Sequence, residues 1–253
     1  MIVAEGVPSL GELFNFRTGL WGIPGFSYSV LSMLIAFVVV SAFMLTVFRS
    51  PATVPSRYQL VGESVIGFVR KDIAEQVIGH EGERFVPYLT TLFLLIFSFN
   101  IMEIIPGVSF PATSKIAVPL FLAVVTYLVF NYQGLRAQGV GHYFKNIAFP
   151  PGVPLVMYIL LTPIEILSIL VIRPITLTLR LTFNMLAGHL ILSLVAVLCA
   201  GLWSASFKAA LLPFTILIGT ALTGFELFVA FLQAFIFTIL TALYIGGAVT
   251  PEH

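Results

Sequence analysis

An arginine in the middle of a long apolar run is the feature that most restricts what this chain can fold into. Arg180 lies within the stretch Ile175–Ile191, whose only other strongly polar side chains, besides threonines, are Asn184 and His189. A guanidinium stays charged at neutral pH, and placing one at the centre of a membrane helix costs about 2.5 to 3.5 kcal/mol on insertion scales. We therefore expect a polar partner to face it.

A second apolar run, Leu211–Tyr244, holds only two strongly polar side chains besides its threonines, Glu226 and Gln233. If the two runs fold as an antiparallel hairpin, residues that meet have position numbers with a constant sum. The pairs Arg180–Gln233 and His189–Glu226 give nearly equal sums, 413 and 415. These sums place the turn near residue 207, within the only polar break between the runs.

The composition of the whole chain is that of a membrane protein. Of its 253 residues, 59% are hydrophobic and 9% are charged, and the mean hydropathy is +1.07. About a quarter of the residues in soluble domains are charged. The net charge of +1 gives no reason to expect nucleic acid as a partner, no histidine pair has metal-ligand spacing, and nothing indicates a cofactor. We predict an all-α polytopic membrane protein and exclude a soluble enzyme.

The apolar runs predict about five membrane helices and one surface helix. Tyr28–Phe48 is uncharged and matches the roughly 20 residues that a helix needs to cross a bilayer core. Val86–Ile105 and Ile116–Tyr132 are the second and third predicted spans. In residues 58–78, apolar side chains recur every fourth position opposite charges, which predicts an amphipathic helix on the membrane surface. The alternative is a solvated helix packed on a neighbouring domain. Residues 133–154 are polar and predict a loop.

The run Leu155–Ala200 is too long for one upright membrane helix. Its 46 residues would extend about 69 Å as a helix. It is either two spans broken at Pro163 or Pro174, or one kinked helix that is steeply tilted. About 40 Å of helix separates Arg180 from the turn, so tilt would return it to mid-membrane depth. We expect one membrane domain, residues 1–253, with an outer N-terminal segment at 1–27, three spans and the surface helix within 28–134, and a steeply tilted helical hairpin at 155–246.

Lysine and arginine placement predicts the orientation. Seven of these residues fall on one side of the predicted spans and three on the other. Because cytoplasmic loops are enriched in Lys and Arg, the first side is predicted to be cytoplasmic. The N-terminus and the hairpin turn are then outside, and the C-terminus is inside.

Titratable residues fall on both sides of the intramembrane cation. His189 is nine positions after Arg180 and so lies on the opposite side of that helix. Glu103, His189 and Glu226 lie toward the outer side, whereas Glu165 precedes Arg180 by 15 residues and lies toward the inner side. This is the layout of two offset aqueous half-channels that a permanent cation keeps apart.

Simpler structural interpretations exist for the central residues. Arg180 could be a packing cation satisfied by Gln233 and backbone carbonyls, although intramembrane ionisable groups are functional candidates by default. His189 and Glu226 could form a static interhelical hydrogen bond. Both alternatives predict side chains that are paired within this chain.

Simpler interpretations also exist for the peripheral residues. Asn100 and Glu103, three positions apart, share a helical face and could merely cap a helix end at the interface. The alternative for Glu165 is a contact with Arg173 or with lipid headgroups. Neither alternative requires a proton pathway.

Three motifs together resemble the signatures of subunit a of the F-type ATP synthase. They are NIMEIIP at residues 100–106, RLTFNMLAGH at 180–189 and LQAFIF at 232–237. The match extends from about Tyr28 to His253, with the motifs in the family's order and spacing. An Arg-Leu pair alone would be weak, but three motifs together are specific.

The resemblance implies a role for each matched residue. Arg180 would be the stator arginine that faces a rotating ring of c subunits and releases protons from their carboxylates. Asn184 and Gln233 would border it, and the outer half-channel would be lined by Asn100, Glu103, His189 and Glu226. The implied partners are the c-subunit ring, the peripheral-stalk b subunits, other membrane-sector subunits and the lipid bilayer. The chain itself would be a non-catalytic subunit of the enzyme.

Two positions depart from the usual pattern. Many bacterial members carry an acid where His189 stands and a histidine where Glu226 stands, so the pair is exchanged here and resembles the mitochondrial arrangement. The exchange keeps one acid and one base, and we expect the two to act together. Glu103 replaces a more usual aspartate.

We therefore favour a proton-conducting stator subunit of a rotary ATP synthase, with Arg180 preventing a proton short circuit. The alternative is a self-contained proton or ion antiporter, and a third hypothesis is a purely structural membrane subunit. The His189 and Glu226 pair favours protons over sodium. The charged surface helix favours a bacterial cell membrane over the mitochondrial inner membrane.

Overall fold

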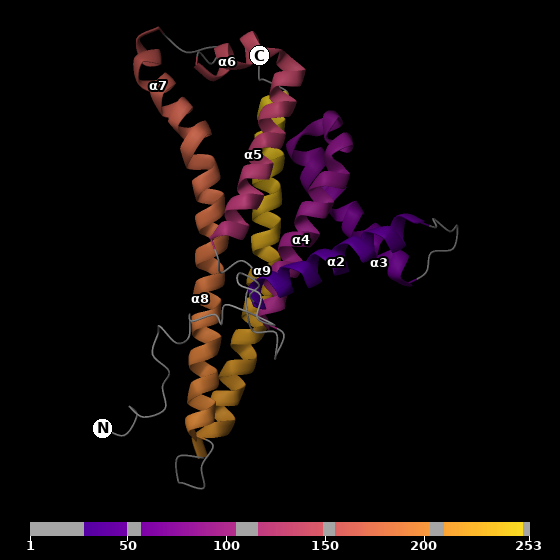
Figure 1. The fold of residues 1–253 in the computed structure, drawn as a ribbon, viewed down its shortest axis with the longest axis vertical. Coiled ribbons are helices and arrows are strands. Elements are labelled where there is room, and N and C mark those ends of the chain that lie inside the picture. Colours follow the sequence, from indigo (N-terminus) through magenta and orange to yellow (C-terminus); the bar gives the residue numbers. More distant parts are fainter. Residues whose placement is uncertain (1–27, 50–56, 105–115, 149–154, 203–209, 250–253) are drawn as a thin grey trace, which may run out of the picture.

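The computed structural model describes residues 28–49, 57–104, 116–148, 155–202 and 210–249, and all secondary structure within these ranges is helical (Figure 1). Within these ranges, five helices are long and apolar enough to cross a membrane. They are α2 (Tyr28–Arg49), α4 (Val86–Ile104), α5 (Ala117–Gln138), a long helix that ends at Leu202, and α9 (Leu212–Val249). The predicted all-α polytopic fold with five membrane helices is confirmed.

The long helix has three parts without a break between them. They are α7 (Leu155–Leu167), a π-helical turn η5 (Ser168–Ile172) and α8 (Arg173–Leu202). Proline removes a backbone donor and clashes with the preceding turn, yet Pro163 lies inside α7 and Pro174 lies in the first turn of α8. The wider π turn lies between them. The single kinked helix is therefore the correct alternative, and two separate spans are not formed.

The register of the α8–α9 hairpin follows the predicted sum. A Cβ atom placed on Gly188 would lie 2.6 Å from Oε2 of Glu226, and one placed on Gly219 would lie 3.0 Å from Cγ1 of Val195. Both pairs have the sum 414, between the predicted values of 413 and 415. The turn itself lies outside the described residues. Small residues at these positions let the two helices approach closely, as is common in membrane helix pairs.

The hairpin lies at a large inclination to the first helix. Figure 1 shows α2 lying across the long axis shared by α8 and α9. The 38 residues of α9 would extend about 57 Å, well beyond a hydrocarbon core of about 30 Å. No membrane normal can be parallel to both α2 and the hairpin, so the crossing supports the prediction that the hairpin is steeply tilted.

The predicted surface helix is divided into unlike halves. It comprises α3 (Arg57–Phe68) and a π-helical segment η2 (Val69–Glu75), before a 3₁₀ segment η3 (Gly79–Phe85) leads into α4. Val61 in the first half is 56% exposed, whereas Val69 and Ile73 in the second half are fully buried. The apolar stripe therefore packs into the protein core in its second half and is open only in its first.

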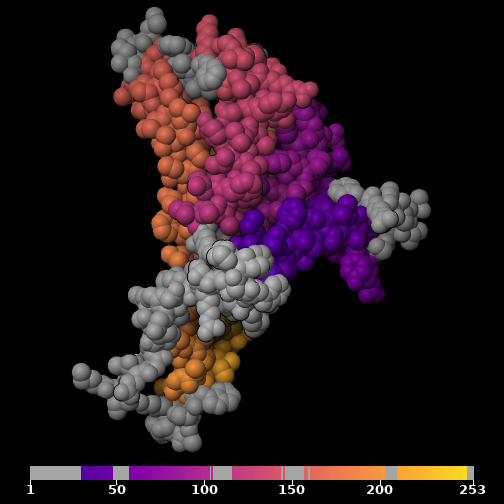
Figure 2. Space-filling view, viewed as in Figure 1, coloured from indigo at the N-terminus to yellow at the C-terminus, as the bar shows by residue number. Residues whose placement is uncertain are grey.

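Aromatic side chains hold α3, α4 and α9 together. Phe68, Phe93 and Phe231 contact one another, with ring centroids 5.8 to 6.0 Å apart, and Phe97 and Phe235 extend the cluster. These distances fall in the favourable range for aromatic pairs. In Figure 2 the α4 and α5 segments form one continuous mass, and the lower ends of α8 and α9 project beyond it. The core is therefore at the end of the hairpin away from its turn.

The prediction of a loop over residues 133–154 is wrong for the described part of that segment. Helix α5 continues to Gln138, and α6 (Val140–Ala148) follows directly. Gly139 ends α5 with a φ of 78° and a ψ of 154°, a conformation that glycine adopts readily because it has no Cβ atom. Tyr143 donates a hydrogen bond to Oδ1 of Asn131 at 2.9 Å, and Gln138 donates to a backbone carbonyl of α9 at 2.7 Å. Polar side chains here join helices instead of solvating a loop.

Burial strengthens the tie between α6 and α5. Burial of Tyr143 raises the pKa of its phenol, with a further increase from Tyr127 and an opposing effect of Arg173. The phenol therefore remains protonated at neutral pH and can donate to Asn131. Residues 149–154 of the predicted loop lie outside the described ranges.

The hairpin register predicts a specific disulfide. In a Cys199→Ala background, Val195→Cys combined with Gly219→Cys should form a disulfide in nearly all molecules, because disulfides need Cβ atoms about 3.5 to 4.5 Å apart. Mass spectrometry of the oxidised membranes measures this. The control pairs Val195→Cys with Gly224→Cys, since a Cβ on Gly224 meets nothing within 4 Å. Equal yields from the two pairs would contradict the register.

Candidate functional site

Arg180 is open to the surroundings of the protein. It is exposed, whereas Leu177 and Leu181 on the same helix are 3% and 1% exposed. Among the residues that the structure describes, none forms a hydrogen bond or ion pair with its guanidinium. The interpretation of Arg180 as a cation buried against its own chain therefore has no support in the described ranges.

Arg180 belongs to an exposed stripe along α8, which we call the arginine stripe. The other members follow at steps of three or four residues and are apolar: Phe183, Ala187, Ile191, Leu194 and Leu198. Phe183 is 59% exposed and Leu194 is 58% exposed. Residues at these steps share one helical face. The stripe is thus an apolar surface about 27 Å long that carries one permanent positive charge.

Two buried amides lie close to the same turn of α9. Gln233 is 5% exposed and Asn100 of α4 is 3% exposed. The amide nitrogen of Asn100 lies 3.4 Å from the carbonyl oxygen of Ala230, one helical turn before Gln233. Oδ1 of Asn100 and Nε2 of Gln233 have no partner in the described part of the chain. A buried polar atom without a partner costs about 1 to 3 kcal/mol, so this region suits bound water.

Asn184 is half-buried, one helical turn after Arg180. That position is on the border between the arginine stripe and the face of α8 that packs against its neighbours. The predicted cluster of Arg180 with Asn184 and Gln233 therefore separates into an exposed cation, a bordering amide and a buried amide.

Glu226 lies in the seam between α8 and α9. It is half-buried, and its carboxylate is directed at Gly188, where any added side chain would collide with it. His189 is the next residue and is also half-buried. Within the described ranges, Glu226 makes no hydrogen bond or ion pair, with His189 or with any other residue. The structure therefore brings Glu226 to the turn of α8 that carries His189 without joining the two side chains.

A groove of about 570 Å³ lies beside Glu226 on the side of the hairpin turn. Its lining comes from three helices and includes Ile104, Cys199, Gly219, Thr220, Thr223 and Leu227. Both threonine hydroxyls donate to carbonyls of their own helix, which leaves their oxygens able to accept hydrogen bonds. The groove thus connects the end of α4 with the seam that holds Glu226.

Glu165 pairs with Arg173 across the π turn. The closest nitrogen and oxygen atoms of the two side chains are 3.4 Å apart, and the guanidinium carbon of Arg173 lies 4.8 Å from the ring centroid of Tyr244. The simpler interpretation, a contact of Glu165 with Arg173, is therefore what the structure contains. Tyr244 was not predicted, because an aromatic residue near the end of an apolar run gives no signal of its own.

Glu103 lies in the last turn of α4, three residues after Asn100, but its side chain is outside the described part of the structure. Its predicted role therefore stays a prediction. Within the described ranges, no three His, Cys, Asp or Glu side chains gather closely enough to hold a metal ion.

Across the described ranges, the fold is that of an all-helical, multi-pass membrane protein whose long hairpin carries an arginine without a partner on an apolar face. The chain belongs to the ATP synthase A chain family, whose model matches residues 30–246.

Three bacterial relatives, each named ATP synthase subunit a, are similar over most of their length. The Frankia alni protein is 46% identical over 213 residues, which are 81% of this chain and 72% of that protein. The Rhodococcus erythropolis protein is 42% identical over 228 residues (88% and 83%), and the Gluconobacter oxydans protein is 40% identical over 227 residues (88% of each). The resemblance stated from the motifs is confirmed.

Proposed function

We propose that this protein is the proton-translocating stator subunit of a rotary ATP synthase in a bacterial plasma membrane. The main observation in support of this proposal is the arginine stripe. A permanent cation on an exposed apolar face requires an acidic partner, which we assign to another chain. The names of the relatives and their bacterial origin support the same conclusion. The subunit is not catalytic itself and acts within the assembled enzyme.

The partner that best fits the stripe is a ring of c subunits, each with a carboxyl group at membrane depth. A cation within about 4 to 6 Å lowers the pKa of a carboxyl group. A protonated ring carboxyl that reaches Arg180 would therefore release its proton. Because arginine does not deprotonate in proteins, Arg180 cannot pass that proton on and would keep the two aqueous routes apart.

The outer route would follow the groove to Glu226. Thr220 and Thr223 offer oxygen atoms along the groove, and Glu226 follows Thr223 on α9 by about one turn, next to the lining residue Leu227. The unpartnered amide atoms of Asn100 and Gln233 would bind water farther along α9. His189 and Glu103 would take part as predicted from the motifs. Protons that enter this way would load the ring.

The inner route would leave past Glu165 and Arg173. Their ion pair is only partly buried, with side chains 37% and 25% exposed, so it is weakly held and accessible to water. Arg180 lies between this pair and the outer residues along α8. Each proton moving down the electrical gradient would supply about 2.3 kcal/mol per 100 mV.

The hairpin of residues 155–246 would lie steeply tilted beside the ring, with the remaining helices of residues 28–134 packed on its other side. Tilt would hold Arg180 near the middle of the bilayer. The peripheral-stalk b subunits would then bind helices away from the arginine stripe. Together these parts form one membrane domain.

Replacing the stripe arginine tests the proposal directly. Arg180→Ala should abolish proton-driven ATP synthesis and allow passive proton exchange, because the barrier between the two routes would be lost. Both are measured with the whole enzyme in vesicles. Thr176→Ala, an exposed change one turn away on the same helix, should leave synthesis nearly unchanged. Synthesis retained by Arg180→Ala would refute the role of Arg180, and transport by the isolated chain would favour an antiporter instead.

The role of the Glu226 carboxyl group is tested by a separate substitution. Glu226→Gln keeps the shape of the side chain but removes its ability to take and release protons. We expect proton flux through the reconstituted enzyme to fall by about tenfold or more, equivalent to about 1.4 kcal/mol in the barrier. Glu75→Gln, an exposed change in η2, is the matched control. Unchanged flux in Glu226→Gln would show that this carboxyl serves packing only.

A further inference from the structure

Besides the groove near Glu226, the protein has a crevice between the beginning of α4 and the end of α5, away from the α8–α9 seam. Its volume is about 600 Å³. Two arginines, one glutamine and aromatic and aliphatic side chains line it: Arg84, Phe85, Tyr88, Val129, Gln133, Arg136 and Ala137. The proposed proton routes use none of these residues, so the crevice requires its own explanation.

The crevice is positively charged. Arg84 and Arg136 come from helices far apart in the sequence, and no acidic residue is part of the lining. The nearest acid to Arg84 is Glu81, 3.1 Å away, but both side chains are about half exposed, and such pairs contribute little. Arg136 is exposed and forms no hydrogen bond or ion pair with the described residues. One unpaired and one weakly held guanidinium thus face a common space.

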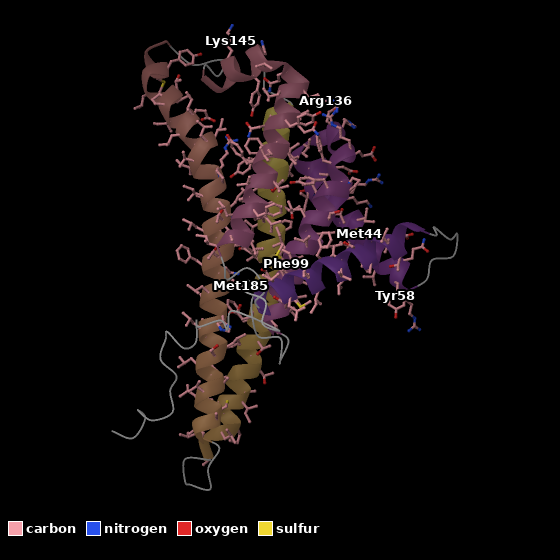
Figure 3. All side chains as sticks on the ribbon, viewed as in Figure 1. Met44, Tyr58, Phe99, Arg136, Lys145 and Met185 are labelled. Atoms are coloured by element: carbon pink, nitrogen blue, oxygen red, sulfur yellow. The ribbon has the colours of Figure 1, made fainter. Side chains whose placement is uncertain are left out.

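The crevice lies where lipid headgroups are expected. Arg84 precedes α4 and Arg136 is in the last turn of α5, so both are at the same membrane surface, which the charge distribution predicts to be cytoplasmic. Figure 3 shows Arg136 at the same end of the molecule as Lys145. Just below it on α5, Leu128 and Tyr132 are each 60% exposed. This arrangement matches a phospholipid: the charged headgroup would occupy the crevice, and the acyl chains would cover the exposed apolar face of α5.

We propose that this crevice binds the phosphate headgroup of an anionic phospholipid in the cytoplasmic leaflet. The planar guanidinium fork matches phosphate oxygens in a bidentate manner. Basic pockets between membrane helices on this side bind anionic headgroups. The adjoining apolar face of α5 favours a lipid over a free phosphate ion, because only a lipid has chains to cover it.

A photoreactive side chain tests this in the whole ATP synthase. Gln133 is replaced by benzoylphenylalanine, and the enzyme is reconstituted in vesicles with equal amounts of phosphatidylcholine and phosphatidylglycerol. Mass spectrometry then measures the ratio of the two lipid adducts. We expect phosphatidylglycerol to be favoured by about fivefold or more, since each arginine near the surface contributes about this factor. The same probe at Val38, on the apolar surface of α2 and 61% exposed, lies away from the crevice and should give a ratio near one.

Matched charge changes separate the crevice from general surface charge. In the Gln133 probe background, Arg84→Gln with Arg136→Gln should reduce the ratio to near one. Arg57→Gln with Lys71→Gln removes two exposed cations that do not line the crevice and should leave the ratio unchanged. ATP-driven proton pumping verifies that each variant assembles.

Three results would overturn the proposal. The first is a ratio near one at Gln133 in the unaltered crevice. The second is loss of the phosphatidylglycerol adduct when inorganic phosphate is added, which would assign the site to the free ion. The third is an adduct with another protein subunit, which would make the crevice a subunit contact.

Discussion

An unneutralised guanidinium on an apolar face is the constraint on which the rest of this structure depends. Arg180 is exposed on α8, and no residue in the described ranges pairs with it. A charge within an apolar membrane helix is energetically costly, and the described residues do not supply the groups that would stabilise it. Helix α8 of the hairpin carries this charge, and helix α9 packs against α3 and α4 in the aromatic core. The described helices therefore form a packed core but leave the charge of Arg180 without a partner, which suits a subunit of a larger assembly.

The close approach of α8 and α9 creates a half-buried site for the Glu226 carboxylate between the two helices. Gly188 leaves space for the Glu226 carboxylate, and Gly219 leaves space for Val195. The seam therefore keeps a titratable group half-buried beside a groove while Arg180 lies outside it. Because Glu226 and Arg180 form no ion pair, this cation does not neutralise the carboxylate, as the proposed proton route requires.

The sequence could predict the features that depend on strong local signals or on pairing along one hairpin. Rare polar residues in two apolar runs were enough to predict the register, because antiparallel helices keep a constant sum. The direction of the Glu226 side chain could not be predicted, since it depends on which neighbour lacks a Cβ atom. The helical state of residues 133–148 is not apparent from the sequence, because the polar side chains of Asn131 and Gln138 form hydrogen bonds with other helices. The crevice between Arg84 and Arg136 arises only when α4 and α5 pack side by side.

The most direct test of the central claim is to identify what covers the arginine stripe in the assembled enzyme. Phe183→Cys, one turn from Arg180 and 59% exposed, is introduced in a Cys199→Ala background and cross-linked to cysteines placed along the c subunit. We expect efficient cross-links to positions of the c subunit near the carboxyl group of that subunit. Leu120→Cys, on α5 and 45% exposed, should give none. If Phe183→Cys is accessible only to lipid, or is cross-linked only within its own chain, the arginine stripe does not face a c-subunit ring.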